Sequence, residues 1–429
     1  MFLGEKMKLD TLCIHAGANP DPTTNARAIP LYRTAAYVFN STEHAANLFA
    51  LRELGNIYTR LMNPTQDALE QRVAAIEGGA AALAFASGTS AIFNSIINIA
   101  QAGDEIVSAA NLYGGTFTMF NDILPQFGIK VNFVNSNNLD EIDQAINDKT
   151  KAVFCETLSN PACDIADIEG ISNIAHKYGI PLIVDATFTT PVLQRPIEHG
   201  ADIVINSLTK WMGGHGSGIG GIVIDSGKFN WQSDKFPLMV EPESSYHGVR
   251  WAYDLPDILA PVAYLIRMRV IPLRNLGAAI SPDNAWQFAQ GIETLPLRMK
   301  KHCENAKAVA EYLNSSDKVD WVKYPGLNDF QVDLNKKYLN GLGGPMVVFE
   351  IKGGLEAGTK FIESLNLFSH LANVGDAKSL AIHSASTTHS QLTSEQQLAA
   401  GITPGLVRLS VGIEDKEDII NDIKQALEA

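Results

Sequence analysis

The segment Pro181–Lys210, with the sequence PLIVDATFTTPVLQRPIEHGADIVINSLTK, contains two short apolar runs that each end in polar residues. The runs are Pro181–Asp185 and Asp202–Asn206, and a helix-length stretch separates them. Short apolar runs that alternate with helix-length stretches are typical of a parallel sheet covered by helices. Ligands bind at the carboxyl ends of the strands in such sheets, so the residues after each run are candidates for a functional site.

The same alternation extends over residues 65–225 and predicts an α/β fold with a mostly parallel central sheet and helices on both faces. The predicted strands are Ala81–Ala86, Glu105–Ala109, Lys130–Val134, Ala152–Glu156, Pro181–Asp185, Asp202–Asn206 and Gly221–Asp225. This α/β domain is expected to occupy residues 61–280.

Two segments lack this alternation. Residues 1–60 are proline-containing with few periodic runs, which predicts an extended N-terminal arm. Residues 226–254 are rich in aromatic side chains but have no clear period, which predicts a long ordered loop. Such a loop could be a lid over a site or an insertion at the surface or at an interface.

A smaller C-terminal α+β domain is expected over residues 281–429. Helical patterns at Asn284–Gln290 and Leu297–Leu313 come before the strand-like run Met346–Ile351.

Composition excludes several classes of protein. The 429-residue chain is 46% hydrophobic with a net charge of −14 and has no basic patch, which argues against disorder and against a nucleic-acid partner. Its N-terminus lacks the apolar core of a signal peptide, and polar residues interrupt its most apolar stretch, Ala80–Ala100. The four cysteines are widely spaced, as in reduced thiols. A cytoplasmic protein without a membrane segment is therefore expected.

The strongest chemical signal is Ser207-Leu-Thr-Lys210, directly after a predicted strand. The hydroxyls of Ser207 and Thr209 could bind a phosphate. Lys210 could form an imine with an aldehyde, because the pKa of a lysine falls when it is partly desolvated. Taken alone, this motif favours a solvated lysine in a surface turn, so Lys210 needs partner residues to be a functional candidate.

Three further residues or motifs follow other predicted strands. Asp185 could pair with a protonated pyridine nitrogen, or could only cap a helix. Ser87-Gly88-Thr89-Ser90 precedes a helical pattern, where free N–H groups favour an anion. Tyr113 could stack on a flat ring, or could be a structural tyrosine. Together with Lys210 these features describe one cofactor, pyridoxal phosphate.

The sequence resembles the cystathionine γ-synthase-like family of pyridoxal-phosphate enzymes, which act in cysteine and methionine metabolism and have the fold of aspartate aminotransferase. The similarity extends from about Thr11 to the C-terminus. The motifs that carry it are Tyr58-Thr-Arg60 with Asn63-Pro-Thr65, Ser87-Gly88, Asn111–Thr116, Glu156–Pro161, Asp185–Phe188, Ser207–Lys210 and Arg408–Glu414.

The resemblance implies a role for each motif residue at the cofactor. Lys210 would hold the cofactor aldehyde as an imine, Asp185 would pair with the ring nitrogen, and Tyr113 would stack on the ring and serve in acid–base steps. The phosphate ligands would be Ser207, Thr209 and the backbone of Gly88 and Thr89.

The resemblance also implies substrate and subunit contacts. Arg408 would bind the substrate α-carboxylate, with contributions from Ser379 and Asn160. Tyr58 and Arg60 would reach the phosphate of a neighbouring subunit, so the arm would complete a homo-oligomer, with a dimer of dimers as the expected assembly.

Within the family, Asn206–Trp211, Gly213–Gly216, Ala385–His389 and the long loop resemble the O-acetylhomoserine sulfhydrylases. The implied reaction is a γ-replacement in which O-acetyl-L-homoserine and sulfide give L-homocysteine and acetate, a step of methionine biosynthesis. Cystathionine γ-synthase and methionine γ-lyase activities are the alternatives, although Gly115 stands where such lyases typically carry cysteine.

Two interpretations outside this family have little support. Gly213–Gly221 could be the phosphate loop of a non-catalytic nucleotide-binding module, but no GxxxxGK[ST] motif is present. His383 and His389 could bind a metal, but they have no acidic or cysteine companion at a suitable spacing. No metal is therefore expected.

Overall fold

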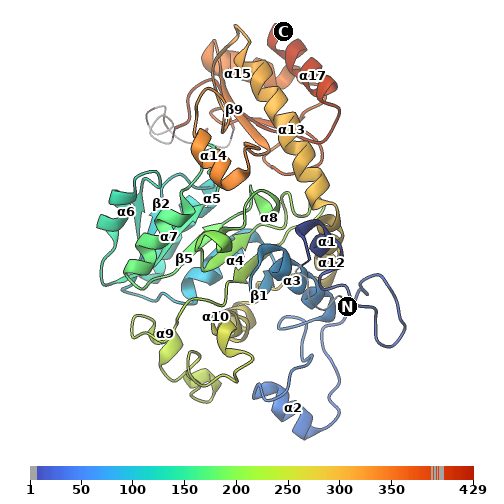
Figure 1. The fold of residues 1–429 in the computed structure, drawn as a ribbon, viewed down its shortest axis with the longest axis vertical. Helices are drawn as coiled ribbons and strands as arrows, with labels where there is room; N and C mark the ends of the chain where they lie inside the picture. Colours follow the sequence, from blue (N-terminus) through green and yellow to red (C-terminus); the bar gives the residue numbers. More distant parts are fainter. Residues whose placement is uncertain (1–6, 388–389, 391–392, 394, 396–400) are drawn as a thin grey trace.

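The computed structural model describes residues 7–387, 390, 393, 395 and 401–429. Its larger part is built on a seven-stranded sheet, and a smaller part with the C-terminus lies above it in Figure 1. The 20-residue helix α13, Leu295–Asn314, runs from the larger part into the smaller one (Figure 1).

The large sheet has the strand order β1-β7-β6-β5-β4-β2-β3. Neighbouring strands from β6 to β3 are parallel, and β7 runs antiparallel to both β1 and β6. The predicted, mostly parallel α/β sheet is therefore confirmed. Its strands are β1 Ala81–Phe85, β2 Glu105–Ala109, β3 Lys130–Val134, β4 Thr150–Glu156, β5 Leu182–Asp185, β6 Ile203–Asn206 and β7 Gly221–Asp225.

Helices cover both faces of this sheet (Figure 1), as is required when its strands are apolar on both sides. The longer helices are α3 Pro64–Glu77, α4 Gly88–Ile97, α6 Leu139–Ala145, α7 Ile168–Lys177, α10 Ala263–Met268 and α12 Pro282–Glu293. Shorter helical segments are α5 Gly114–Thr118, Met119–Ile123, Leu124–Phe127, α8 Thr190–Leu193, Pro196–His199, Ala260–Val262, Arg269–Leu273 and α11 Arg274–Leu276.

The smaller part contains a five-stranded sheet of order β10-β11-β12-β9-β8, in which β10 and β11 are parallel and the other neighbours antiparallel. Its strands are β8 Val319–Lys323, β9 Met346–Ile351, β10 Ser369–His370, β11 Leu380–His383 and β12 Leu406–Ser410. Its further helices are α14 Val332–Leu339, α15 Gly354–Ser364 and α17 Lys416–Glu428.

Helix α13 contributes buried residues to two apolar cores. Its first half, with Met299 and Cys303, belongs to the core of the large sheet together with α12. From Ala306 onward its buried residues belong to the core of the small sheet. The chain therefore changes core inside α13, about 25 residues after the expected boundary at residue 280.

The N-terminal arm is helical at two places. Helix α1, Leu9–His15, packs on the large part through buried Cys13. Beyond it the chain extends away from the body to α2, Thr42–Phe49 (Figure 1). Val38 and Leu54 lie on this extension and are 96% and 67% exposed, so apolar side chains of the arm are open to a neighbour.

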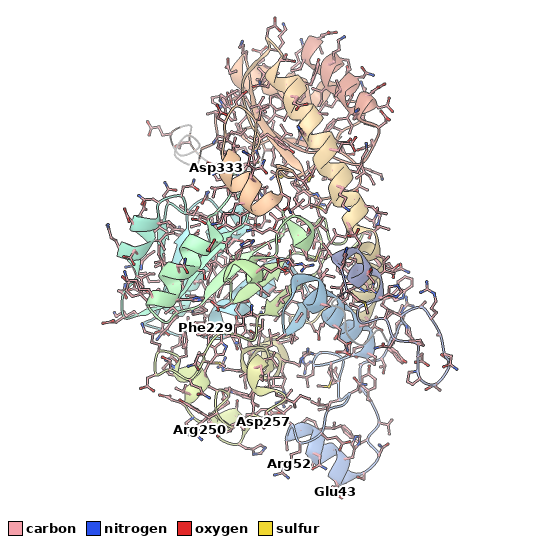
Figure 2. All side chains as sticks on the ribbon, viewed as in Figure 1. Glu43, Arg52, Phe229, Arg250, Asp257 and Asp333 are labelled. Atoms are coloured by element: carbon pink, nitrogen blue, oxygen red, sulfur yellow. The ribbon has the colours of Figure 1, made fainter. Side chains whose placement is uncertain are left out.

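Residues 226–254 form an ordered segment with the short helix α9, Pro237–Val240, and a single turn at Ser244–Tyr246. Trp231 and Trp251 are buried in the main core, and Trp231 stacks on Tyr264 at 4.9 Å. Figure 2 places Arg250 and Asp257 at the same end of the molecule as Arg52 of the arm, and the Tyr246 hydroxyl donates to the Phe49 carbonyl.

Within the described residues, no helix has the length and apolarity to cross a membrane.

Arg72 holds α1 and α12 to α3. Its fully buried guanidinium donates to the carbonyls of Ala16 at 2.9 Å, Ile14 at 3.1 Å and Ala289 at 2.5 Å, and lies 3.4 Å from Glu293. We predict that Arg72→Ala lowers the free energy of unfolding by about 3 kcal/mol, because three backbone carbonyls lose a donor that is itself fully buried.

Urea unfolding followed by tryptophan fluorescence measures this change. Glu293→Gln is the matched control. It removes only the half-exposed partner and should cost less than about 1 kcal/mol. Equal effects of the two substitutions would contradict the assignment.

Candidate active site

A cavity of about 270 Å³ lies at the carboxyl ends of β4, β5 and β6. The large part contributes the start of α4, Tyr113 and the strand ends, and the small part contributes Asn373 and Arg408. The site therefore lies where the two parts meet, at the edge that parallel-sheet topology predicts.

Lys210 follows β6 and lines this cavity. Its Nζ donates to Asn373 Oδ1 at 2.5 Å. Burial, with a smaller contribution from the charge of Arg408, lowers the pKa of Lys210 to about 8. A substantial fraction of neutral amine is therefore available near physiological pH, as nucleophilic attack on an aldehyde requires.

Two carboxyl groups stand side by side at the ends of β4 and β5, because Glu156 and Asp185 are paired in the sheet register. Both line the cavity. Burial raises the pKa of Asp185, and burial together with the charge of Asp185 raises the pKa of Glu156 well above its usual range. A cation that lies in the cavity next to these carboxyl groups, such as a protonated ring nitrogen, would be strongly favoured.

The start of α4 fits a phosphate. Ser87 caps the helix by accepting from the Ser90 N–H, and the first-turn N–H groups of Gly88 and Thr89 have no acceptor within the helix. A Cβ at Gly88 would lie 2.8 Å from Ser207 Cβ, so only glycine lets this turn approach Ser207. Ser207 and Thr209 line the same cavity as Gly88 and Thr89. The arrangement matches an anion site at a helix N-terminus.

Tyr113 precedes α5 and is half exposed. Its backbone N–H donates to Glu156 Oε1 at 2.7 Å. A Cβ at Gly115 would lie 2.6 Å from the Tyr113 ring, so a side chain at position 115 would displace the ring.

Arg408, on β12, reaches the cavity from the small sheet. Its guanidinium donates to Asn160 Oδ1 at 2.9 Å and to the Asn373 carbonyl at 3.5 Å. Burial lowers the pKa of Arg408 to about 10, so it remains a cation at neutral pH. No carboxylate of the described residues forms an ion pair with it, which leaves the guanidinium free for an anionic ligand.

The cavity thus brings together most of the predicted site residues, namely Gly88, Thr89, Tyr113, Asn160, Asp185, Ser207, Thr209, Lys210 and Arg408. It does not bring Ser379 there. The Ser379 N–H donates to Glu414 Oε1 at 2.6 Å and its hydroxyl to Glu414 Oε2 at 2.9 Å, so its backbone N–H is not available to a substrate.

Tyr58 and Arg60 lie outside the cavity of their own chain, on the exposed part of the arm. The Arg60 guanidinium stacks over the Tyr58 ring at 4.9 Å.

Glu156 and Asn373 are among the cavity residues to which sequence reasoning gave no role. Glu156 carried a signal, because it ends a predicted strand next in order to the one that ends at Asp185. Asn373 had none, because it lies in a loop after β10 whose place depends on packing between the two parts of the chain.

Residues 226–254 contribute nothing to the lining of this cavity, so a lid formed by this segment over its own chain's site is not observed. Four of its aromatic residues, Trp231, Phe236, Tyr246 and Trp251, are instead buried in the main core.

Of the two histidines considered for a metal, His383 donates from Nε2 to the Pro404 carbonyl and bonds through Nδ1 to the Ser386 hydroxyl, and His389 lies outside the described residues. The described part of the chain holds no cluster of three metal-binding side chains.

Comparison with known proteins identifies the family. Residues 10–428 match the model of the Cys/Met metabolism PLP-dependent enzymes. The chain is 54% identical to an O-acetyl-L-homoserine sulfhydrylase of Leptospira meyeri, over 99% of this chain and 98% of that protein. It is 47% identical to the homocysteine synthase of Schizosaccharomyces pombe, over 99% of both chains.

A similar solved structure is that of a Campylobacter jejuni protein assigned as an O-acetylhomoserine (thiol)-lyase, with a TM-score of 0.94 and 41% identity over 99% of this chain and 100% of that one. It contains a pyridoxyl-lysine phosphate residue. The predicted cofactor and fold are thereby confirmed, and the chain belongs to the family of PLP-dependent enzymes of Cys/Met metabolism.

Proposed function

We propose that this enzyme converts O-acetyl-L-homoserine and sulfide into L-homocysteine and acetate by γ-replacement. The observation that carries the proposal is the convergence of the Lys210 amine and the unpaired Arg408 guanidinium on one cavity in a chain whose relatives are named sulfhydrylases and homocysteine synthases.

Pyridoxal phosphate, when bound, supplies an aldehyde for the substrate amine and a ring that accepts electrons released at Cα. We assign the phosphate to Gly88, Thr89, Ser207 and Thr209, and the ring nitrogen to Asp185. Tyr113 would lie against the ring face.

The protein's own groups orient the substrate and move its protons. Arg408 would bind the α-carboxylate, with Asn160 holding the guanidinium at 2.9 Å. Lys210 Nζ, whose pKa is lowered to about 8, would remove the proton from Cα and later return one. The Tyr113 hydroxyl is the second candidate for proton transfer. Loss of acetate and addition of sulfide then take place at the same carbon, Cγ.

Exclusion of water is the further requirement, because hydrolysis would give 2-oxobutanoate and ammonia instead of homocysteine. The position of the site between the two parts of the chain supports such exclusion.

We also propose that the active enzyme is a homo-oligomer in which the Tyr58 and Arg60 side chains reach a neighbour's phosphate. Their exposure outside their own cavity, and the exposed apolar residues of the arm, support this assembly. The four buried free thiols support a reducing, cytoplasmic location.

The first prediction concerns the reaction. The purified enzyme should show a visible cofactor band and form homocysteine only when sulfide is supplied. Lys210→Ala should abolish the band and slow homocysteine formation about a thousand-fold or more. Lys177→Ala, an exposed lysine paired with Asp143, is the control and should change neither. Cystathionine from cysteine, or 2-oxobutanoate without a thiol, would assign the enzyme to synthase or lyase activity.

The second prediction concerns the carboxylate site. Arg408→Met should lower kcat/KM for O-acetylhomoserine roughly 10²- to 10³-fold, mainly through KM, since the carboxylate loses a buried charged partner. Arg408→Lys should recover only part, because an ammonium cannot form the planar fork. Arg250→Met, which breaks a surface pair with Asp254, should leave the kinetics unchanged. Wild-type KM in Arg408→Met would refute the assignment.

The third prediction concerns the arm. Arg60→Ala and Lys210→Ala enzymes should each be inactive, and a mixture dissociated and reassembled together should regain about a quarter of wild-type activity, since half of the dimers would be hybrids with one intact site. Activity that stays at the level of the separate variants would show that Arg60 acts within its own chain.

A further inference from the structure

The carboxyl group of Glu156 has contacts to three parts of the cavity. Its Oε1 accepts the Tyr113 backbone N–H at 2.7 Å, and the Asn160 backbone N–H lies close enough to this carboxyl group to act against the rise of its pKa. Its neighbour across the β4–β5 register is Asp185. The side chain is 8% exposed, so these backbone donors rather than water satisfy it.

Each of these contacts ends at a residue with a proposed role. Tyr113 is the proposed ring-stacking residue. Asn160 Oδ1 accepts from the Arg408 guanidinium at 2.9 Å. Glu156 therefore joins the loop after β2 and the loop after β4 to the strand end that carries the carboxylate for the ring nitrogen.

The backbone N–H groups of Tyr113 and Asn160 have few acceptors other than the Glu156 carboxyl group. A buried N–H without an acceptor costs free energy comparable to a lost hydrogen bond, so loss of the Glu156 acceptor destabilises the observed position of these backbone groups. Because Tyr113 is half exposed, packing restrains its ring little, and its backbone bond carries more of the positioning.

We infer that Glu156 is a positioning residue that sets the ring of Tyr113 over the cofactor and, through Asn160, the guanidinium of Arg408 at the substrate carboxylate. The inference rests on the proposed roles of Tyr113 and Arg408 and deepens them. Glu156 acts through these residues, because its buried carboxyl group accepts the Tyr113 N–H and lies beside the backbone N–H of Asn160.

The test compares Glu156→Ala, which removes the acceptor, with Glu156→Gln, which keeps a carbonyl oxygen of nearly the same reach. Matched controls are Glu350→Ala and Glu350→Gln. Glu350 is a buried glutamate on β9 that likewise accepts a backbone N–H, that of Gly405 at 2.9 Å, but it lies in the small sheet and does not line the cavity.

The first readout needs no substrate. Visible circular dichroism of the bound cofactor reports how rigidly its surroundings hold it. We expect the band to weaken at least about two-fold in Glu156→Ala and to recover most of its intensity in Glu156→Gln. The second readout is KM for O-acetylhomoserine, which should rise roughly ten- to a hundred-fold in Glu156→Ala and less in Glu156→Gln. Both Glu350 variants should keep the wild-type dichroism and KM, whatever their thermal stability.

Wild-type dichroism and KM in Glu156→Ala would overturn the inference, and so would a glutamine variant as impaired as the alanine variant. If Glu156→Ala does not accumulate as folded protein, Glu156→Asp, which is one methylene shorter, takes its place with the same expectations. The dichroism is measured without substrate, so a wild-type enzyme that makes no homocysteine would refute the proposed function and leave the result on Glu156 standing.

Discussion

The active site depends on ionisable groups that are buried without a partner of opposite charge in the described part of the chain. Lys210, Asp185 and Arg408 come from different strands or from the loops that follow them. Burial raises the pKa of Asp185 and lowers the pKa of Lys210 and of Arg408, so it disfavours the charged form of each group. Desolvated charges of this kind lower stability unless a ligand of complementary charge is bound. A cofactor with a phosphate, an aldehyde and a cationic ring nitrogen, together with a substrate carboxylate, supplies that complement.

The rest of the fold keeps these groups in place. The parallel strands β4, β5 and β6 end at one edge, so their last residues lie next to one another without any special local geometry. Helix α13 is shared between two apolar cores, which couples the small sheet carrying Arg408 to the large sheet carrying Lys210. The hydrogen bonds from Arg408 to Asn160 and from Lys210 to Asn373 cross the same junction.

Sequence reasoning located the strands well because their signal is local. The predicted ends of Met346–Ile351 and of six of the seven central strands agree with the structure to within one residue, and the exception, β4, begins at Thr150 instead of Ala152. Sequence reasoning was less accurate for segments whose burial depends on packing against residues far away in the chain. The sequence predicts a long ordered loop over residues 226–254 but does not indicate its packing. Trp231 and Trp251 are buried in the main core, because an aperiodic segment can still be covered by distant helices.

The sequence by itself determined the α/β class, the family, the cofactor and the residues after each strand, because strand periodicity and motif spacing are properties of contiguous residues. Only the tertiary structure decided which of these residues meet. It bound the Ser379 N–H to Glu414, it brought Asn373 from a distant loop to Lys210, and it placed Glu156 between Tyr113 and Asp185. Such contacts depend on how separate elements pack, and this information is not contained in the spacing of residues along one segment.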